Sequence, residues 1–323
     1  MNDGVKTKVS VLVLCYNQRA SIERALDSVL GQHTDFDVEV IAGDDCSTDG
    51  TAETVRRYAE RYPERVRVIT GRENVGLVEN YRRCLKAARG EYIADCAGDD
   101  FWTDADRLQT LTGMLESDRT VSAVFSDYEI MENGTSRTAP AYGADPESDR
   151  IAGAEVTAGA LNHVKSLPFF LSAGIYRRSA VGNPDELFGR GWLCEDVAVE
   201  AAIGKSGDVL IYHKPTVSYT IGEETVSNSR DAARMARFYL ADLKMTAELA
   251  PKYGMGQEWL GEYFDAKISY AVTLAWRSGG KVGTSEIEEA MAAWSLRPGI
   301  RSRIRMTILK IRELCRNFNL KRN

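Results

Sequence analysis

Long apolar runs, paired cysteines and histidine clusters are what this sequence of 323 residues lacks. Without a run of 18 apolar residues, it predicts no helix that spans a bilayer. The six cysteines are scattered and form no C-x-x-C pair, which argues against disulfides or zinc and favours free thiols in the cytoplasm. With 8 prolines and 44% hydrophobic residues, the composition excludes collagen-like and disordered chains and predicts an ordered globular protein.

Two common phosphate-binding motifs are also missing. Gly204-Lys205-Ser206 matches the end of a P-loop, but Val199 stands where that motif requires its first glycine. No G-x-G-x-x-G follows an apolar strand pattern, so the fingerprint of a dinucleotide-dependent dehydrogenase is absent. The sequence therefore predicts neither a P-loop enzyme nor a dehydrogenase.

Strand and helix patterns alternate over the first 130 residues. Apolar runs typical of strands lie at 9–14, 37–42, 65–70, 91–95 and 121–125, with helical spacing at 22–30, 55–62, 77–89 and 108–115. This alternation predicts βαβ crossovers and a parallel sheet covered by helices on both faces. Further along, we expect an irregular connection over 131–166, strands at 167–178 and 208–221, a helix at 195–204, and long helices from about 228.

Acidic pairs follow two of the predicted strands. Asp44-Asp45 comes after the second strand and Gly98-Asp99-Asp100 after the fourth, while Tyr16-Asn17 follows the first. In open α/β sheets, ligands bind outside the carboxyl ends of the strands, so these side chains should converge on one edge. A turn is the alternative for Gly98-Asp99-Asp100. The position at a strand end instead favours a ligand-binding role, in which one carboxylate binds a Mg²⁺ or Mn²⁺ ion and its neighbour binds a ligand hydroxyl.

A wider set of motifs occurs in a characteristic order. They are Leu14-Cys15-Tyr16-Asn17, Asp44-Asp45-Cys46-Ser47-Thr48-Asp49-Gly50-Thr51, Asn74-Val75-Gly76, Ala88-Arg89-Gly90-Glu91-Tyr92 and Gly98-Asp99-Asp100. This arrangement resembles the family 2 glycosyltransferases, inverting enzymes with the GT-A fold that binds nucleotide-diphospho-sugars. The resemblance covers roughly residues 7–225 and is strongest over 9–130. Helix capping by Ser47, Thr48 or Asp49 is expected in addition.

The resemblance implies a role for each matching residue. Asp45 matches the carboxylate that accepts the pyrimidine N3–H, and Tyr16 matches the aromatic that lines the base pocket. Because cytosine N3 is itself an acceptor, Asp45 disfavours a CMP-sugar and leaves UDP and dTDP open, with a guanine nucleotide as the less favoured alternative. Asp99 matches a nucleotide and sugar contact, and Asp100 matches the metal ligand of a DxD-like motif. Further nucleotide-sugar contacts are implied for Leu14, Asn17 and Asn80.

An inverting transfer also needs a base for the acceptor hydroxyl. In the family this carboxylate lies in a late Glu-Asp motif at a helix start, which Cys194-Glu195-Asp196-Val197 fits, so the resemblance implies Asp196 as general base. Helix capping is the alternative role for either acid. The Arg-x-His that many relatives carry near a closing strand has no counterpart in 218–222. His213 and Lys214 are candidates for the missing ligand, although a lone histidine beside a strand is more often structural.

Positive charge is concentrated at the C-terminal end. Residues 297–323 hold a net charge of +8, whereas residues 1–296 hold −14. An apolar stripe runs along the predicted helix 300–318, with arginines one position behind it. The stripe consists of Ile300, Ile304, Ile308, Ile311, Cys315 and Phe318, and the arginines are Arg301, Arg305, Arg312 and Arg316. This pattern favours an anionic membrane surface as partner; docking on the acidic body and nucleic-acid binding are the alternatives, and we expect no nucleic-acid partner.

The sequence thus predicts a GT-A domain with a Rossmann-like mixed sheet over residues 1–225, a helical extension over 226–296 and a basic amphipathic helix over 297–323. The resemblance implies a metal-dependent inverting glycosyltransferase using Mn²⁺ or Mg²⁺. Its donor would be a UDP- or dTDP-sugar, and its acceptor a glycan or lipid-linked hydroxyl in cell-surface polysaccharide synthesis. We expect it in the cytoplasm, peripherally on the inner face of the plasma membrane. A non-catalytic sugar-nucleotide-binding or scaffold subunit is the alternative.

Overall fold

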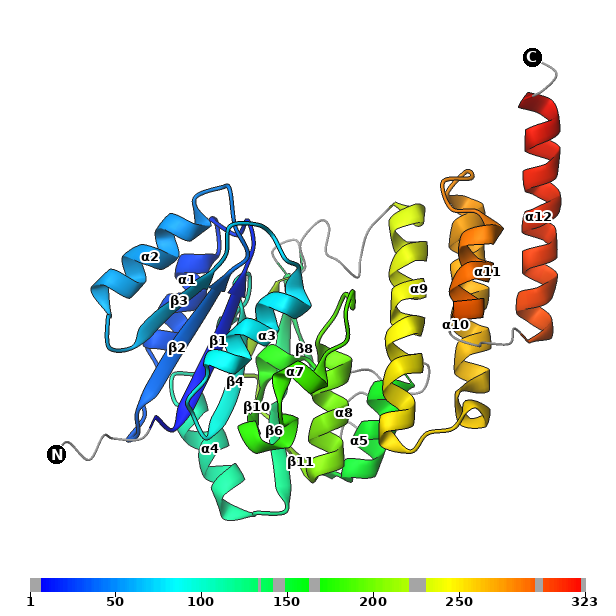
Figure 1. Cartoon of the computed structure of the whole chain (residues 1–323). Helices are drawn as coiled ribbons and strands as arrows, with labels where there is room; N and C mark the ends of the chain where they lie inside the picture. Colours follow the sequence, from blue (N-terminus) through cyan, green and yellow to red (C-terminus); the bar gives the residue numbers. More distant parts are fainter. Residues whose placement is uncertain are drawn as a thin grey trace. The chain divides into compact units, whose positions relative to one another are not determined.

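The computed structural model of the chain describes residues 7–132, 135–141, 149–162, 169–220, 231–293 and 299–320 (Figure 1). Contacts divide the chain into two compact units. The first comprises residues 1–160, 165–188 and 194–221, and the second comprises residues 161–164, 189–193 and 222–323. The first unit is α/β, and the described part of the second is helical.

An eight-stranded mixed sheet forms the centre of the first unit, in the order β3-β2-β1-β4-β10-β6-β11-β9. Its strands are β1 (Val9–Cys15), β2 (Val38–Asp44), β3 (Val66–Thr70), β4 (Tyr92–Ala97), β6 (Val121–Ser126), β9 (Arg150–Ile151), β10 (Gly174–Arg177) and β11 (Asp208–Tyr212). The first four strands in sequence are parallel, as predicted. β10 runs antiparallel to both β4 and β6, which makes the sheet mixed.

Helices from the predicted alternation cover this sheet. They are α1 (Ile22–Leu30), α2 (Thr51–Arg61), α3 (Leu77–Ala87), α4 (Arg107–Ser117) and the later α8 (Asp196–Ser206). The apolar stripe of α1 faces the sheet, with Ile22, Ala25 and Leu26 fully buried. Together with β1, β2 and β4, these residues form the core that holds the carboxyl ends of the central strands in place.

The segment expected to be irregular is more structured than predicted. A second sheet has the order β5-β12-β7-β8, built from β5 (Phe101–Trp102), β7 (Tyr128–Glu132), β8 (Thr135–Ala139) and β12 (Val217–Thr220). The prediction of an irregular connection over 131–166 is therefore wrong for β8, β9 and α5 (Gly153–Leu161). The strand expected over 167–178 is shorter, because a 3₁₀ turn at Leu171–Ala173 precedes β10, and residues 163–168 lie outside the described residues. Two short helices follow, α6 (Arg178–Val181) and α7 (Pro184–Leu187).

The second unit contains four longer helices (Figure 1). These are α9 (Ala232–Leu249), α10 (Gln257–Arg277), α11 (Thr284–Ala293) and α12 (Ile300–Leu320), with a 3₁₀ turn at Ala250–Tyr253. They share an apolar core in which Leu243, Ile268 and Ile287 are completely buried. Among the described residues, no helix is long and apolar enough to cross a membrane.

Candidate functional site

The carboxyl ends of β1, β2 and β4 lie side by side. Cys15 at the end of β1 pairs with Asp44 of β2, and Leu14 pairs with Ala97 of β4. The backbone continues this alignment beyond the strands, since the Asp45 amide donates to the Cys15 carbonyl at 3.0 Å. The Gly98 amide likewise donates to the Leu14 carbonyl at 2.8 Å. The two acidic pairs and the Tyr-Asn pair that sequence analysis placed after separate strands therefore meet on one edge of the sheet.

Asn17 joins the loops that follow β1 and β2. Its backbone amide donates to Ser47 Oγ at 2.9 Å, and its side-chain oxygen accepts from the Thr48 amide at 2.8 Å. Asn17 itself has a left-handed φ of 53°, which asparagine tolerates better than most residues. Next to it, Tyr16 remains 48% exposed, so about half of its surface is accessible to a ligand.

Asp45 is held by backbone donors. Its Oδ1 accepts from the Val75 amide at 2.8 Å and its Oδ2 from the Gly76 amide at 2.9 Å, while the Asn74 side chain donates to the Asp45 carbonyl. These contacts explain why the Asn74-Val75-Gly76 motif accompanies the acidic pair. Each carboxylate oxygen keeps a second lone pair, so the held group can still accept from a ligand.

Two other residues predicted to contact the nucleotide-sugar, Asn80 and Leu14, are less accessible. Asn80 is 3% exposed and donates from Nδ2 to the Gly43 carbonyl at 2.8 Å, which ties α3 to the end of β2. Leu14 is half-buried in β1 and packs close to Gly43. In this structure both residues support the rim on which Asp45 lies, and a direct ligand contact by either stays a prediction.

Asp99 and Asp100 lie in different surroundings. Asp100 is 1% exposed, and its carboxylate accepts from Ser172 Oγ at 2.9 Å and from the Thr220 amide at 3.3 Å. Burial, and secondly the charge of Asp99, raise the pKa of Asp100 to about 8. Asp99 is half-buried, and burial raises its pKa, opposed by a hydrogen bond from Gln18. Two adjacent carboxyl groups are thus held in a poorly solvated position.

The chemistry of this acidic pair fits a hard divalent cation. Buried oxygens without a hydrogen-bond partner occur on Gln18, which contacts Asp99, and on Thr220, whose amide donates to Asp100. Ser218, which pairs with Phe101 next to Asp100, has a third such oxygen. No group of three or more His, Cys, Asp or Glu residues able to hold a metal occurs among the residues the structure describes. An ion here would therefore have at most two protein carboxylates and would need ligand oxygens to complete its coordination, which is how Mg²⁺ is usually bound with substrate phosphates.

Asp196 is the first residue of α8, and its Oδ1 accepts from the Val197 amide at 2.9 Å. A negative charge in the first turn of a helix is favourable. Residues 197–204 of this helix are all buried, so the carboxylate stands at the end of a rigid element. Its neighbour Glu195 has an unpartnered buried oxygen, and burial, then the charge of Asp196, raises the pKa of Glu195.

A buried polar cluster behind Asp196 was not predicted from the sequence. Tyr81 of α3 and Tyr176 of β10 share a hydrogen bond of 2.5 Å between their hydroxyls. The charges of Asp95 and Glu195 both raise the pKa values of these hydroxyls, after burial as the main cause. The cluster links the Glu195-Asp196 segment to β4, the strand that leads to Asp99-Asp100. Sequence spacing gives no signal for it, because its members come from four separate elements.

Asp95 makes this cluster sensitive to pH. Burial raises its pKa to about 7, above the value of about 3.9 expected in the unfolded chain. The folded state therefore binds this proton more tightly than the unfolded chain does. The resulting contribution to the free energy of unfolding is present at low pH and is lost as pH rises from about 4 to 7. We expect Asp95→Asn to raise the free energy of unfolding at pH 8 by up to about 4 kcal/mol.

Urea unfolding at pH 8 and at pH 4.5 checks this expectation, because the gain should shrink at the lower pH. Asp35→Asn, a change at an exposed carboxylate, is the matched control and should give no such pH-dependent gain. An Asp95→Asn protein no more stable than the wild type at pH 8 would contradict the assignment of a costly buried charge.

The candidates for a late diphosphate ligand are otherwise engaged. His213 lies between two aspartates, with Nδ1 3.7 Å from Asp127 Oδ2 and Nε2 3.3 Å from Asp149 Oδ1. Lys214 pairs with Asp104 Oδ2 at 2.6 Å. Neither interaction involves Asp99 or Asp100. Residues 221–230, which follow β12, lie outside the described residues.

Comparison with known proteins identifies the first unit. The profile described as Glycosyl transferase family 2 matches residues 10–168. Over 132 residues the chain is 37% identical to the putative teichuronic acid biosynthesis glycosyltransferase TuaG of Bacillus subtilis, covering 40% of this chain and 50% of TuaG. It is 33% identical to the putative glycosyltransferase EpsE of the same organism over 152 residues, covering 47% of this chain and 53% of EpsE. The chain thus spans about half the length of these relatives.

Solved structures show a similar fold across the chain. Staphylococcus aureus TarS 1–349 in complex with UDP-GlcNAc aligns with a TM-score of 0.58 at 17% identity, covering 93% of this chain and 89% of TarS 1–349. The mannosyltransferase PcManGT of Pyrobaculum calidifontis, in complex with GDP-Man and Mn²⁺, aligns with a TM-score of 0.54 at 19% identity. That alignment covers 96% of this chain and 81% of PcManGT. The α/β unit therefore has a GT-A-like fold.

Proposed function

We propose that this chain, a family 2 glycosyltransferase through the domain at residues 10–168, is an inverting enzyme that uses a UDP- or dTDP-sugar. The sugar would pass to a hydroxyl of a glycan or lipid-linked acceptor. The observation that carries the proposal is the convergence of Tyr16, Asp45 and Asp99-Asp100 on one edge of the sheet, at the ends of three adjacent strands. That edge is where open α/β sheets bind their ligands.

Asp45 would recognise the base. Its two oxygens already accept from the amides of Val75 and Gly76, which keeps the group an acceptor in a fixed orientation. A fixed acceptor suits the N3–H of uracil or thymine and opposes cytosine, whose N3 is also an acceptor. The half-exposed ring of Tyr16 would stack against the same base.

Asp100 would hold a Mn²⁺ or Mg²⁺ ion together with the donor diphosphate, and Asp99 beside it would contact the nucleotide and sugar. When bound, such an ion neutralises charge that develops on the departing nucleoside diphosphate. The protein's own part is to bring the diphosphate to the acidic pair. Ser172 and the Thr220 amide fix the orientation of Asp100 by hydrogen bonds to its carboxylate.

Asp196 would be the general base. Its carboxylate takes the proton of the acceptor hydroxyl as that oxygen bonds to the anomeric carbon and the bond to the diphosphate oxygen breaks. Attack from the face opposite the leaving group inverts the anomeric configuration. The rigid setting of α8, buried over 197–204, supports this assignment because a base must be held in place to be effective.

Cell-surface polysaccharide synthesis is the pathway we propose, supported by the similarity to TuaG over 40% of this chain. The cytoplasm is the proposed compartment, with the enzyme at the inner face of the plasma membrane, where a lipid-linked acceptor is accessible. Cys15, Cys46, Cys84 and Cys96 are free thiols, as expected in a reducing compartment.

Nucleotide selectivity tests the donor site directly. In thermal-shift titrations with Mn²⁺, UDP and dTDP should raise the melting temperature, and CDP should bind about tenfold to a hundredfold more weakly because of the mismatched N3. Asp45→Asn should lose this preference, since an amide has only one oxygen to accept from the Val75 and Gly76 amides and from a ligand N3–H.

Two results would contradict the donor assignment. Equal shifts in melting temperature from UDP and CDP in the wild type would contradict the proposed role of Asp45 in recognising the base. A response to UDP without any turnover of UDP- or dTDP-sugars, across a panel of glycan and lipid-linked acceptors, would favour the non-catalytic binding subunit instead. Asp35→Asn, with its change on the exposed surface, should keep the wild-type preference.

A further inference from the structure

The helix α12 packs on its own unit with a face other than its isoleucine stripe. Ser302, Met306 and Leu309 are 0%, 6% and 3% exposed. Ser302 Oγ donates to the Asp265 side chain at 2.5 Å, and Arg305 donates to the Ser269 carbonyl, both on α10. The side chains of residues 314–320 lie outside the described residues, whereas those of residues 300–313 are described.

The isoleucine stripe is left exposed on the opposite side. Ile300, Ile304, Ile308 and Ile311 are 72%, 56%, 55% and 56% exposed. At 100° per residue these four side chains centre about 170° away from the packed face of Ser302, Met306 and Leu309. Packing within the unit therefore does not explain the stripe.

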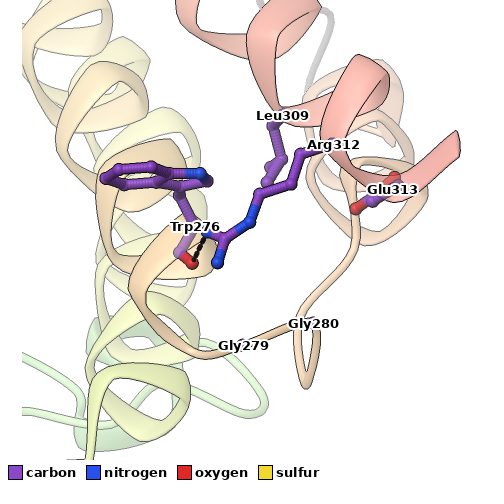
Figure 2. A pocket seen from close by; sticks show the side chains of 6 residues that line it. All are labelled: Trp276, Gly279, Gly280, Leu309, Arg312 and Glu313. Atoms are coloured by element: carbon purple, nitrogen blue, oxygen red, sulfur yellow. Dashed lines mark hydrogen bonds between the residues drawn. The ribbon is translucent and has the colours of Figure 1, made fainter. Parts of the chain in front are cut away.

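Cations border the stripe on both sides. Arg301, Arg305 and Arg312 project along one flank, and Arg303 and Lys310 along the other, and all five are exposed. On the first flank, Arg312 donates to the Trp276 carbonyl at 2.7 Å, and its guanidinium carbon lies 4.8 Å from the centre of the Trp276 ring. These two residues, with Leu309, line a cavity of about 150 Å³ (Figure 2). Trp276 is 47% exposed, so an aromatic ring adjoins the cationic border.

The residue types on this surface indicate which kind of partner it fits. Of the nine large hydrophobic residues that are exposed in the described chain, four form the stripe, and the others are Tyr16, Leu77, Leu193, Tyr270 and Trp276. Among its described residues, a second copy thus offers no comparable aliphatic surface except the same stripe. Pairing stripe against stripe would bring rows of arginine together, which like-charge repulsion opposes. An apolar strip between two cationic rows instead fits the boundary between acyl chains and anionic headgroups.

We propose that the face of α12 formed by Ile300, Ile304, Ile308 and Ile311 lies on an anionic lipid leaflet, with the flanking cations at the headgroups. The helix would lie parallel to the membrane plane, because the cations border the stripe along its length. Trp276 would sit at the level of the headgroups, where tryptophan is enriched in membrane proteins. This surface is independent of the donor site and does not require the proposed catalysis.

Vesicle flotation of the full chain, without donor or acceptor, tests the proposal. We expect binding to vesicles of phosphatidylcholine with about a third phosphatidylglycerol, and at least tenfold weaker binding to phosphatidylcholine alone. Ile304→Glu with Ile308→Glu should weaken anionic-vesicle binding at least tenfold. The matched control, Leu77→Glu with Leu193→Glu, adds the same charges at other exposed leucines and should bind like the wild type.

Three results would overturn the proposal: no binding to anionic vesicles, equal binding to both vesicle types, or unchanged binding after the isoleucine substitutions. If the isoleucine substitutions abolished a dimer in sedimentation velocity but left vesicle binding unaffected, the stripe would be an interface with a second copy. Hydrogen exchange on the wild type provides a readout that does not depend on variant folding. Anionic vesicles should slow exchange across 300–313, and unchanged exchange there would contradict the proposal.

Discussion

Replacing Asp196 with asparagine should lower kcat by about 10²–10⁴-fold while the affinity for UDP stays within about threefold of the wild type. A positioned general base contributes an acceleration of this size, and the amide cannot take the proton of the acceptor hydroxyl. The fold should survive, since the side-chain oxygen of asparagine can still accept from the Val197 amide, as Asp196 does at 2.9 Å. Steady-state transfer rates and calorimetric titration with UDP measure the two quantities separately.

Two further variants separate chemistry from structure. Glu195→Gln alters the adjacent acid, whose pKa is raised by burial and secondly by the charge of Asp196. Because Asp196 remains as the base, kcat should fall less than tenfold. Asp185→Asn changes another first-turn aspartate, at the exposed start of α7, and should leave kcat unchanged. Near-normal turnover in Asp196→Asn, or an equal loss in Glu195→Gln, would show that the base lies elsewhere in the Glu-Asp motif or outside it.

The central fold could be predicted because its signals are local. The expected strand at 9–14 is β1 (Val9–Cys15), and the expected strand at 37–42 overlaps β2 (Val38–Asp44), since both are nearly continuous buried runs. α1 has an apolar stripe of helical period and begins at the predicted residue, Ile22. For such segments, burial and periodicity point to the same structure.

Local signals fail where pairing or packing decides the structure. β8 has the sequence Thr-Ser-Arg-Thr-Ala and is exposed over 135–138, so it lacks the apolar alternation that identifies a strand. It exists because it pairs with β7. α5 is made largely of small residues without a polar face, which hides its helical period. Neither pairing partners nor packing partners can be derived from a short stretch of sequence.

The site shows the same division. The order of the motifs and their positions at strand ends were enough to predict that Tyr16, Asp45 and Asp100 lie on one edge of the sheet. The groups that hold Asp45 are backbone amides of Val75 and Gly76, and a backbone amide has no distinct residue type to recognise. In α12, hydrophobicity alone would select the isoleucines as the packed face, yet Ser302, Met306 and Leu309 are buried instead. Only the partner surface on α10 decides between the two faces.

Replacing Asp100 with asparagine should abolish the response to metal. We expect transfer to fall by about 10²–10³-fold, because the proposed ion would supply several kcal/mol of stabilisation to the departing diphosphate. Mn²⁺ should no longer increase the thermal shift that UDP produces. In the wild type, EDTA should remove activity, and added Mn²⁺ or Mg²⁺ should restore it.

The surroundings of Asp100 allow this loss to be distinguished from misfolding. Asparagine can still accept from the Thr220 amide and can exchange a hydrogen bond with Ser172, while a buried carboxyl group with a raised pKa is removed. The variant should therefore melt at the same temperature as the wild type or higher at neutral pH. Asp99→Asn is the companion change, and it should weaken donor binding but preserve the Mn²⁺ response. An Asp100→Asn enzyme that is still activated by Mn²⁺ would contradict the assignment of Asp100 as the metal ligand.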